Sequence, residues 1–237
     1  MSIAYHIELP FVLEQTTFDR FERASSICGL QVRNTRRLDY VDEYWDTKDA
    51  DLHASSMAVR ARRRPPAEVD QLNFKGPPRY VAPFLFARPL INESVSSSQA
   101  AVEALRGQRP SQTLASLYET RADLAGRPLQ PIAEAFISRQ NVDLHDSRGE
   151  GVCTLSFHRY RLMKDSQAIT DGYLLEVQPF CRSPIVSAAM IRVFEVVHNR
   201  LTAEGCVASP IGKYHRIPRG MLEQPRTQGY SGQTAVT

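Results

Sequence analysis

The sequence has few cysteines and no long apolar run, and both absences exclude whole classes of protein. Its four cysteines, Cys28, Cys153, Cys181 and Cys206, are widely spaced and form neither a Cys-x-x-Cys pair nor a Cys/His cluster at zinc spacing. We therefore expect reduced, buried thiols rather than disulfides or a zinc site. No stretch approaches the apolar length of a membrane span, and the first residues lack the basic and apolar regions of a signal peptide. These absences predict a cytoplasmic protein that does not bind membranes.

A strong excess of charge of one sign is also missing. The 237 residues carry 29 lysines and arginines against 26 aspartates and glutamates, a formal net charge of +3. This excess is too small to predict a nucleic acid partner, so the positions of the charges tell more than their sum. The apolar fraction of 42% and the charged fraction of 23% are those of an ordinary globular protein.

Basic residues are concentrated in one stretch, Tyr44 to Gly76, which contains two alternating segments separated by a Pro-Pro turn. Arg60 and Arg62 share one face of the first segment, and Lys75 shares a face of the second segment with two amide side chains. Because successive side chains of a strand point to opposite sides, these groups gather on one surface of a sheet. Such a surface is suited to binding anions.

A solvated edge strand would carry the same arginines, since charged edges protect sheets from aggregation. The regular alternation and the presence of Lys75 favour an interior position for Arg60 and Arg62. Arg63 and Arg64, beside the turn, are expected to be exposed.

Other segments are typical of strands and helices. Strands are expected near residues 5–13, 33–40, 84–95, 136–144, 152–162 and 173–178, and helices near residues 14–28, 96–106, 111–125 and 184–204. Ser183 is the expected N-cap of the last helix, with Pro184 at its first position. An open sheet would leave its polar face to water, but this polar face carries charged and amide side chains on strand after strand. We therefore predict an α+β fold in which a closed antiparallel β-barrel has a charged lumen and helices packed outside.

The end of the chain differs in composition from the rest. Residues 1–220 are expected to form a single domain. Residues 221–237 are rich in Gly, Gln, Thr and Ser and are expected to be a disordered tail.

Several short motifs together resemble the CYTH superfamily, also called the triphosphate tunnel metalloenzymes. They are Tyr44-Trp45-Asp46-Thr47 followed by Asp51-Leu52, Ala58-Val59-Arg60-Ala61-Arg62-Arg63, Leu72-Asn73-Phe74-Lys75-Gly76-Pro77, Leu175-Glu176-Val177 and Gly212-Lys213-Tyr214. The resemblance covers nearly everything before the tail. It implies a closed eight-stranded antiparallel β-barrel, a tunnel in which basic side chains hold a triphosphate and carboxylates bind a divalent metal.

The resemblance also implies roles for single residues. The side chains that would bind phosphate are Arg60, Arg62, Lys75, Arg139 and Lys213. Glu8 and Glu176 would be catalytic, either as ligands of Mg²⁺ or Mn²⁺ or as supports for the basic groups. Arg forks and Lys ammoniums match phosphoryl oxygens, and a metal would neutralise charge on the transferred group. His158 is a candidate general acid or base because imidazole titrates near neutrality, with a structural histidine as the alternative.

The N-terminal strand departs from the family pattern. Where the family has Glu-x-Glu-x-Lys, this chain has His6, Glu8 and Pro10, and Gln178 stands where a second glutamate would pair with Glu176. Fewer carboxylates weaken the binding of a hard cation. The sequence therefore retains the anion-binding half of the site better than the metal-binding half.

Three functions are compatible with these features. The default is metal-assisted hydrolysis of a phosphoanhydride in an inorganic or organic di- or triphosphate. A lyase or cyclase that expels diphosphate from a nucleotide or an isoprenoid diphosphate needs anion-binding groups but no metal-activated water. A polyphosphate-binding module without catalysis is the third. The partner is in each case a phosphorylated small molecule, and the oligomeric state is open, a homodimer being one option.

Overall fold

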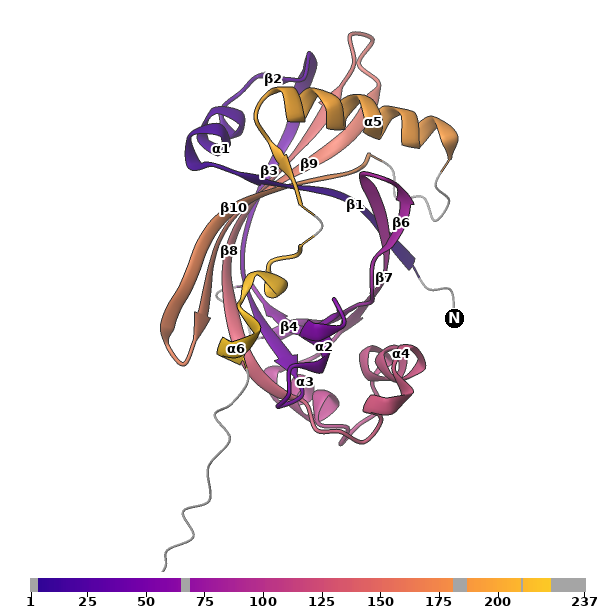
Figure 1. The fold of residues 1–237 in the computed structure, drawn as a ribbon, viewed down its shortest axis with the longest axis vertical. Helices are drawn as coiled ribbons and strands as arrows, with labels where there is room; N and C mark the ends of the chain where they lie inside the picture. The colour runs from indigo at the N-terminus through magenta and orange to yellow at the C-terminus, as the bar shows by residue number, and fades with distance from the viewer. Residues whose placement is uncertain (1–3, 65–68, 181–186, 210, 223–237) are drawn as a thin grey trace, which may run out of the picture.

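Eight antiparallel strands of the computed structural model close into a ring (Figure 1). The structure describes residues 4–64, 69–180, 187–209 and 211–222. Around the ring the order is β1-β10-β9-β8-β3-β4-β5-β7, and β7 pairs with β1 to complete it. The ring strands are β1 Ala4–Leu13, β3 Leu30–Asp46, β4 Ala58–Arg63, β5 Val69–Lys75, β7 Leu85–Ser94, β8 Gln130–His145, β9 Gly151–Lys164 and β10 Gln167–Pro179. The predicted α+β fold with a closed eight-stranded antiparallel sheet is confirmed.

Three short strands that are not part of the ring pair with strands of the ring: β2 Ser26–Ile27 with β3, β6 Arg79–Ala82 with β7, and β11 Val207–Ala208 with β1. Strand β1 pairs with β7 through residues 4–8 and with β11 through residues 11–12. Pro10 lies between the residues that pair with β7 and those that pair with β11, so its missing N–H interrupts neither of these two ladders. This change of partner explains how a proline is accommodated inside a ring strand.

Helices pack on two sides of the ring. The helices are α1 Gln15–Glu22, α2 Asp51–Ala54, α3 Ser98–Leu105, α4 Gln112–Thr120, α5 Ala188–Ala203 and α6 Arg219–Leu222, with 3₁₀ turns η1 Ala122–Leu124 and η2 Tyr214–Arg216. Phe18 of α1 and Phe194 of α5 are buried in one core with Phe157 of β9. Leu105 of α3 and Leu117 of α4 are buried in a second core on the opposite side of the ring. Each such side chain contributes about 1.5–3 kcal/mol through burial.

Several boundaries differ from the sequence predictions. The helix expected over residues 14–28 ends at Glu22, because the residues after it form β2 and turn into β3 through Cys28 and Gly29, which adopt positive φ angles of 55° and 74°. The predicted cap Ser183 and Pro184 lie outside the described residues, and α5 begins at Ala188. Met221 and Leu222 belong to α6 rather than to a disordered tail, while the rest of that predicted tail, residues 223–237, lies outside the described residues. None of the helices in the described ranges is long and apolar enough to cross a membrane.

The N-cap of α3 provides a local test of stability. Ser97 accepts a hydrogen bond at its side chain from the backbone N–H of Ala100, at 3.1 Å. We expect Ser97→Ala to lower the free energy of unfolding by about 1 kcal/mol, because an N–H of the first turn loses its acceptor. Urea unfolding measures the change, and Ser96→Ala, next to the cap and exposed, is the matched control. Equal effects of the two substitutions would contradict the role of the cap.

Candidate functional site

The strand registers bring charged side chains from five neighbouring strands to the inside of the ring. Glu8 of β1 alternates with Ile7 and Leu9, which are buried in the outer core, so Glu8 points into the lumen. Pro10 lies opposite Glu176 of β10. The same alternation turns three further side chains of the ring inward: Arg88 of β7, Lys75 of β5 and Arg60 of β4.

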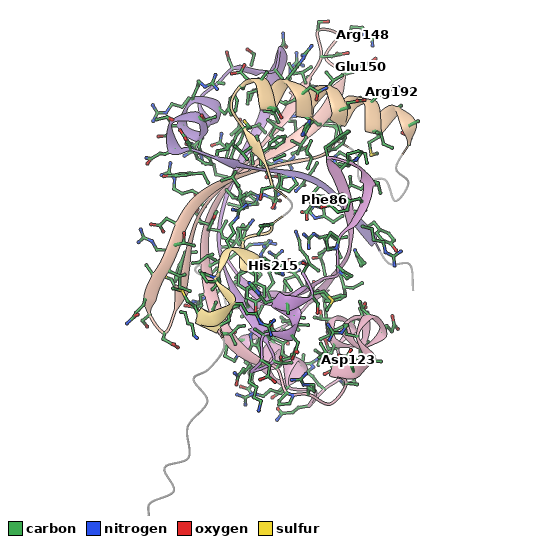
Figure 2. The ribbon with its side chains drawn as sticks, viewed as in Figure 1. Phe86, Asp123, Arg148, Glu150, Arg192 and His215 are labelled. Carbon is green, nitrogen blue, oxygen red and sulfur yellow. The ribbon has the colours of Figure 1, made fainter. Side chains whose placement is uncertain are left out.

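The chain after β11 crosses one side of the lumen and adds two more polar side chains. The ring of Tyr214 stacks on Tyr44, with ring centroids 4.7 Å apart, and its hydroxyl donates to Asp46 Oδ2 at 2.7 Å. These contacts position Lys213 and His215 on either side of it. Figure 2 shows His215 inside the ring.

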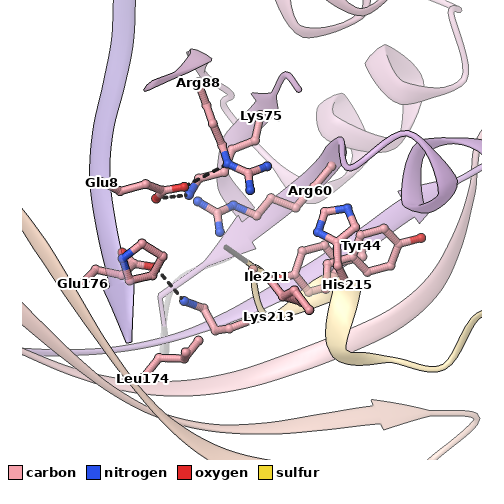
Figure 3. Close-up of a pocket in the computed structure, with 14 residues that line it drawn as sticks. Glu8, Tyr44, Arg60, Lys75, Arg88, Leu174, Glu176, Ile211, Lys213 and His215 are labelled. Carbon is pink, nitrogen blue, oxygen red and sulfur yellow. Dashed lines mark hydrogen bonds and ion pairs between the residues drawn. The ribbon is translucent and has the colours of Figure 1, made fainter. Parts of the chain in front are cut away.

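These residues line one pocket (Figure 3). Its cationic side chains are Arg60, Lys75, Arg88 and Lys213, and its carboxylates are Glu8 and Glu176. Apolar groups form another part of the wall: Pro10, Ala58, Leu174 and Ile211. The pocket therefore combines a basic region with an apolar one.

Both carboxylates of the pocket are held by cations. Glu8 lies 3.1 Å from Lys75 Nζ and 3.0 Å from Arg88 Nε, and Glu176 lies 3.4 Å from Lys213 Nζ. Burial raises the pKa of each carboxyl group, but the neighbouring positive charges outweigh it, and the pKa of both is lowered. Both carboxylates are therefore ionised at neutral pH and neutralise part of the surrounding positive charge.

A third carboxylate, Asp42 of β3, is fully buried and binds two of the arginines that were predicted to bind phosphate. It accepts a hydrogen bond from Arg60 Nη1 at 2.8 Å and two from Arg62, at 2.6 and 2.9 Å. The guanidinium of Arg62 also lies over the ring of Tyr40, 3.8 Å from its centroid. Burial opposes ionisation of Asp42, yet the two arginines hold its pKa down, at about 2. Arg62 is thus fixed beside the pocket and does not line it, whereas Arg60 does.

His158 and Arg139 lie opposite each other in the β8–β9 register, next to the pocket but not in its lining. His158 Nε2 is 3.3 Å from Glu176 Oε2. Burial and the charge of Lys213 lower the pKa of His158 to about 3, so its ring is uncharged at neutral pH. Arg139 donates to the side chains of Asn141 and Ser156, at 2.6 and 2.8 Å.

The structure therefore brings together Glu8, Arg60, Lys75, Glu176 and Lys213 of the predicted site. Two basic side chains of the pocket, Arg88 and His215, were not among the predicted site residues. Arg88 alternates with Ala87 along its strand, which would turn it inward, but Pro89 disfavours a central strand there. His215 follows Lys213 by two residues and comes from a segment without periodicity, so nothing in the sequence indicates that it points inward.

His215 is an uncharged acceptor in the pocket wall. Its Nε2 lies 3.0 Å from the carbonyl oxygen of Met57, a contact that requires the proton on Nε2 and leaves Nδ1 as the acceptor. Burial, together with His53 and Arg88, lowers the pKa of His215 to about 3. The ring is therefore neutral over the whole physiological range.

This burial predicts a pH dependence of stability. In the unfolded chain histidine has a pKa of about 6.5, so between pH 6.5 and 3 the unfolded state binds a proton that the folded state does not. The resulting loss of unfolding free energy is absent above this pH window and grows as the pH falls through it. We expect His215→Gln to reduce the slope of the unfolding free energy against pH by about 1.4 kcal/mol per pH unit inside the window. Urea unfolding at a series of pH values measures the slope, and identical slopes for variant and wild type would contradict the prediction.

The predicted Mg²⁺ or Mn²⁺ site would need oxygen ligands from this pocket. Hard divalent cations take oxygen ligands, mostly carboxylates. The parts of the chain that the structure describes contain no group of three His, Cys, Asp or Glu side chains that could hold a metal ion. The two carboxylates of the pocket, Glu8 and Glu176, already form ion pairs with basic side chains. These residues do not fit a metal site.

Comparisons with known proteins place the chain in a family. The family model described as the CYTH domain matches residues 4–156. A solved structure of a proposed adenylate cyclase from Bacillus halodurans is 15% identical, with a TM-score of 0.53, and the match covers 91% of this chain and 98% of the other. A second structure, a proposed adenylyl cyclase from Hippeastrum described as having a dominant triphosphatase activity, is 14% identical with a TM-score of 0.56, over 91% and 96% of the two chains.

No curated protein matches the sequence. The two solved structures support the fold alone, because their identity to this chain is low. The domain match covers well over half of the sequence, from β1 into β9, and includes the strands that carry Glu8, Arg60, Lys75 and Arg88. The chain belongs to the CYTH domain family.

Proposed function

We propose that the protein binds the phosphate chain of an inorganic or organic di- or triphosphate in the tunnel and hydrolyses a phosphoanhydride bond in it. One observation carries the proposal: Arg60, Lys75, Arg88 and Lys213 come from β4, β5, β7 and the segment after β11, and all reach the same pocket (Figure 3). A phosphate chain carries several negative charges in a line. Cations that approach it from different walls can contact successive phosphoryl groups at once.

Hydrolysis of a phosphoanhydride depends mainly on positioning of the substrate and stabilisation of its developing charge. In hydrolysis a water oxygen bonds to a phosphorus atom and the bridging P–O bond breaks. The leaving phosphate or diphosphate takes the electron pair of that bond, and the proton lost by the water passes to the leaving group or to solvent. Fixed Lys and Arg side chains stabilise the charge on the equatorial and leaving oxygens. The neutral Nδ1 of His215 supplies an acceptor in the wall at which a water can be oriented. The ion pairs of Glu8 and Glu176 hold Lys75, Arg88 and Lys213 in place before the substrate arrives.

A panel of substrates tests the proposal. Purified protein is incubated with inorganic tripolyphosphate, nucleoside triphosphates and prenyl diphosphates, with Mg²⁺, with Mn²⁺ or with EDTA, and the products are identified by mass spectrometry. We expect orthophosphate release from at least one triphosphate. Tight binding without any product would leave a binding module, and absence of both binding and product would overturn the proposal.

A second candidate is favoured by the apolar part of the pocket. Leu174 and Ile211 line it beside the basic side chains, and both carboxylates are occupied. A lyase or cyclase that expels diphosphate from an organic substrate uses such an apolar wall and needs no activated water. The apolar run Phe84-Leu85-Phe86 does not line this pocket. Diphosphate together with a rearranged organic product, in the same panel, would support this candidate over the hydrolase.

A further inference from the structure

The carboxylates of the pocket are occupied on all four of their oxygens. Glu8 Oε1 faces Arg88 Nε at 3.0 Å, and Oε2 faces Lys75 Nζ at 3.1 Å and His6 Nδ1 at 3.3 Å. On the neighbouring strand, Glu176 Oε1 faces Lys213 Nζ at 3.4 Å. Its Oε2 faces His158 Nε2 at 3.3 Å and accepts a hydrogen bond from Gln178 Nε2, also at 3.3 Å. Figure 3 shows Lys75 and Arg88 beside Glu8, and Lys213 beside Glu176.

A divalent cation would have to displace these partners. Mg²⁺ requires oxygen ligands at about 2.0–2.1 Å in octahedral geometry, usually one or two carboxylates completed by water and substrate phosphates. An ion bound at Glu8 or Glu176 would lie within a few ångström of buried ammonium and guanidinium groups, which repel it strongly where water is scarce. The inward positions that could add a carboxylate carry His6, Pro10 and Gln178 instead.

The basic side chains can neutralise the charge on the phosphate chain, which a bound metal ion would otherwise do. Arg88 is 4% exposed and Lys213 is 7% exposed, so both charges act in a region of low dielectric constant. Each is fixed by a carboxylate and reaches the pocket at the same time. Such preorganised cations neutralise phosphoryl oxygens without the reorganisation that a mobile ion requires.

We propose that the tunnel takes its phosphate chain as the metal-free anion, with Lys75, Arg88 and Lys213 in place of a divalent cation. The inference rests on the proposed function, because it assumes that a phosphate chain binds in this pocket. It applies equally to hydrolysis and to expulsion of diphosphate. It predicts that divalent metal competes for the ligand, since Mg²⁺ complexes free tripolyphosphate.

Calorimetric titration with inorganic tripolyphosphate, in EDTA and in excess Mg²⁺, tests the inference. We expect binding in EDTA to be at least as tight as in Mg²⁺. Affinity that is about tenfold or more weaker in EDTA, a difference of about 1.4 kcal/mol, would overturn the inference and leave the proposed function standing. Absence of binding under both conditions would instead overturn the proposed function, and the inference with it.

A second measurement does not depend on phosphate. Titration of the wild-type protein with Mn²⁺, followed by the electron paramagnetic resonance signal of the free ion, is expected to show no stoichiometric site. The double substitution His6→Glu, Gln178→Glu adds two carboxylates beside Glu8 and Glu176 and is expected to create one. Gln99→Glu with Gln167→Glu, at exposed positions, adds the same charge elsewhere. A wild-type site that Glu8→Gln removes would overturn the inference whether or not the double variant folds.

Discussion

Replacement of Asp42 by alanine is expected to lower the free energy of unfolding by about 3–5 kcal/mol, because it leaves two inward-facing guanidinium groups without their carboxylate. Asp42 is fully buried, and the side chains of Arg60 and Arg62 are only 13% and 11% exposed. Water can therefore replace the lost partner only in part. Urea unfolding measures the change, and a loss below about 1 kcal/mol would show that the arginines find other partners.

The control for this prediction is a pair of the same chemistry on the surface. Asp171 accepts two hydrogen bonds from Arg161, at 2.8 and 3.2 Å, but the two side chains are 59% and 60% exposed. Asp171→Ala is expected to cost several times less than Asp42→Ala, because solvent screens an exposed pair and solvates the remaining charge. Comparable losses at the two sites would mean that burial does not determine the effect.

The pH dependence separates the charge of Asp42 from its packing. Its pKa of about 2 lies below the value of about 3.9 in an unfolded chain, so the contribution of its charge is present above pH 4 and is lost as the pH falls toward 2. The difference in stability between the wild type and Asp42→Asn should therefore shrink below pH 4. A constant difference would indicate that hydrogen-bond geometry, rather than charge, holds the arginines.

The closed sheet could be predicted from the sequence because successive side chains of a barrel strand point alternately into the lumen and outward. Arg60, Arg62 and Lys75 alternate with apolar residues, and in the structure Arg60 and Lys75 reach the pocket while Arg62 points toward Asp42. Strand length was harder to predict. β3 is expected from residue 33 to 40 but runs from Leu30 to Asp46, because its second half pairs with both β4 and β8. Pairing partners of this kind are distant in sequence and leave no local signal.

The site was less predictable than the fold for a related reason. Asp42 follows Tyr40 at the strand period, yet its role depends on Arg60 and Arg62 of the next strand, and only the register reveals it. The sequence does not indicate Arg88, because Pro89 next to it is unfavourable in a central strand. In the ring Pro89 lies opposite Tyr5, and its carbonyl accepts from the N–H of Gly76 at 2.9 Å. A single proline can be accommodated where the partner does not need its N–H, and sequence alone does not identify such places.

The substitutions Lys75→Met and Lys213→Met are each expected to weaken the binding of inorganic tripolyphosphate by about 10- to 100-fold. A hydrogen bond to a charged group contributes about 1.5–3 kcal/mol, and methionine keeps most of the side-chain volume while removing the charge. Calorimetric titration measures the affinity. Lys48→Met removes the same charge from an exposed turn that does not line the pocket and should leave the affinity nearly unchanged.

Lys75 and Lys213 lie on different parts of the fold, so a comparison of the two variants shows which part binds the phosphate chain. Lys75 belongs to the wall of the ring, whereas Lys213 lies on the segment after β11, which Tyr214 fixes by stacking on Tyr44. If only Lys75→Met weakens binding, the phosphate chain contacts the wall and the C-terminal segment merely closes the lumen. If both do, that segment is part of the binding site. Unchanged affinity in both variants, with binding intact in the wild type, would place the phosphate chain outside this pocket.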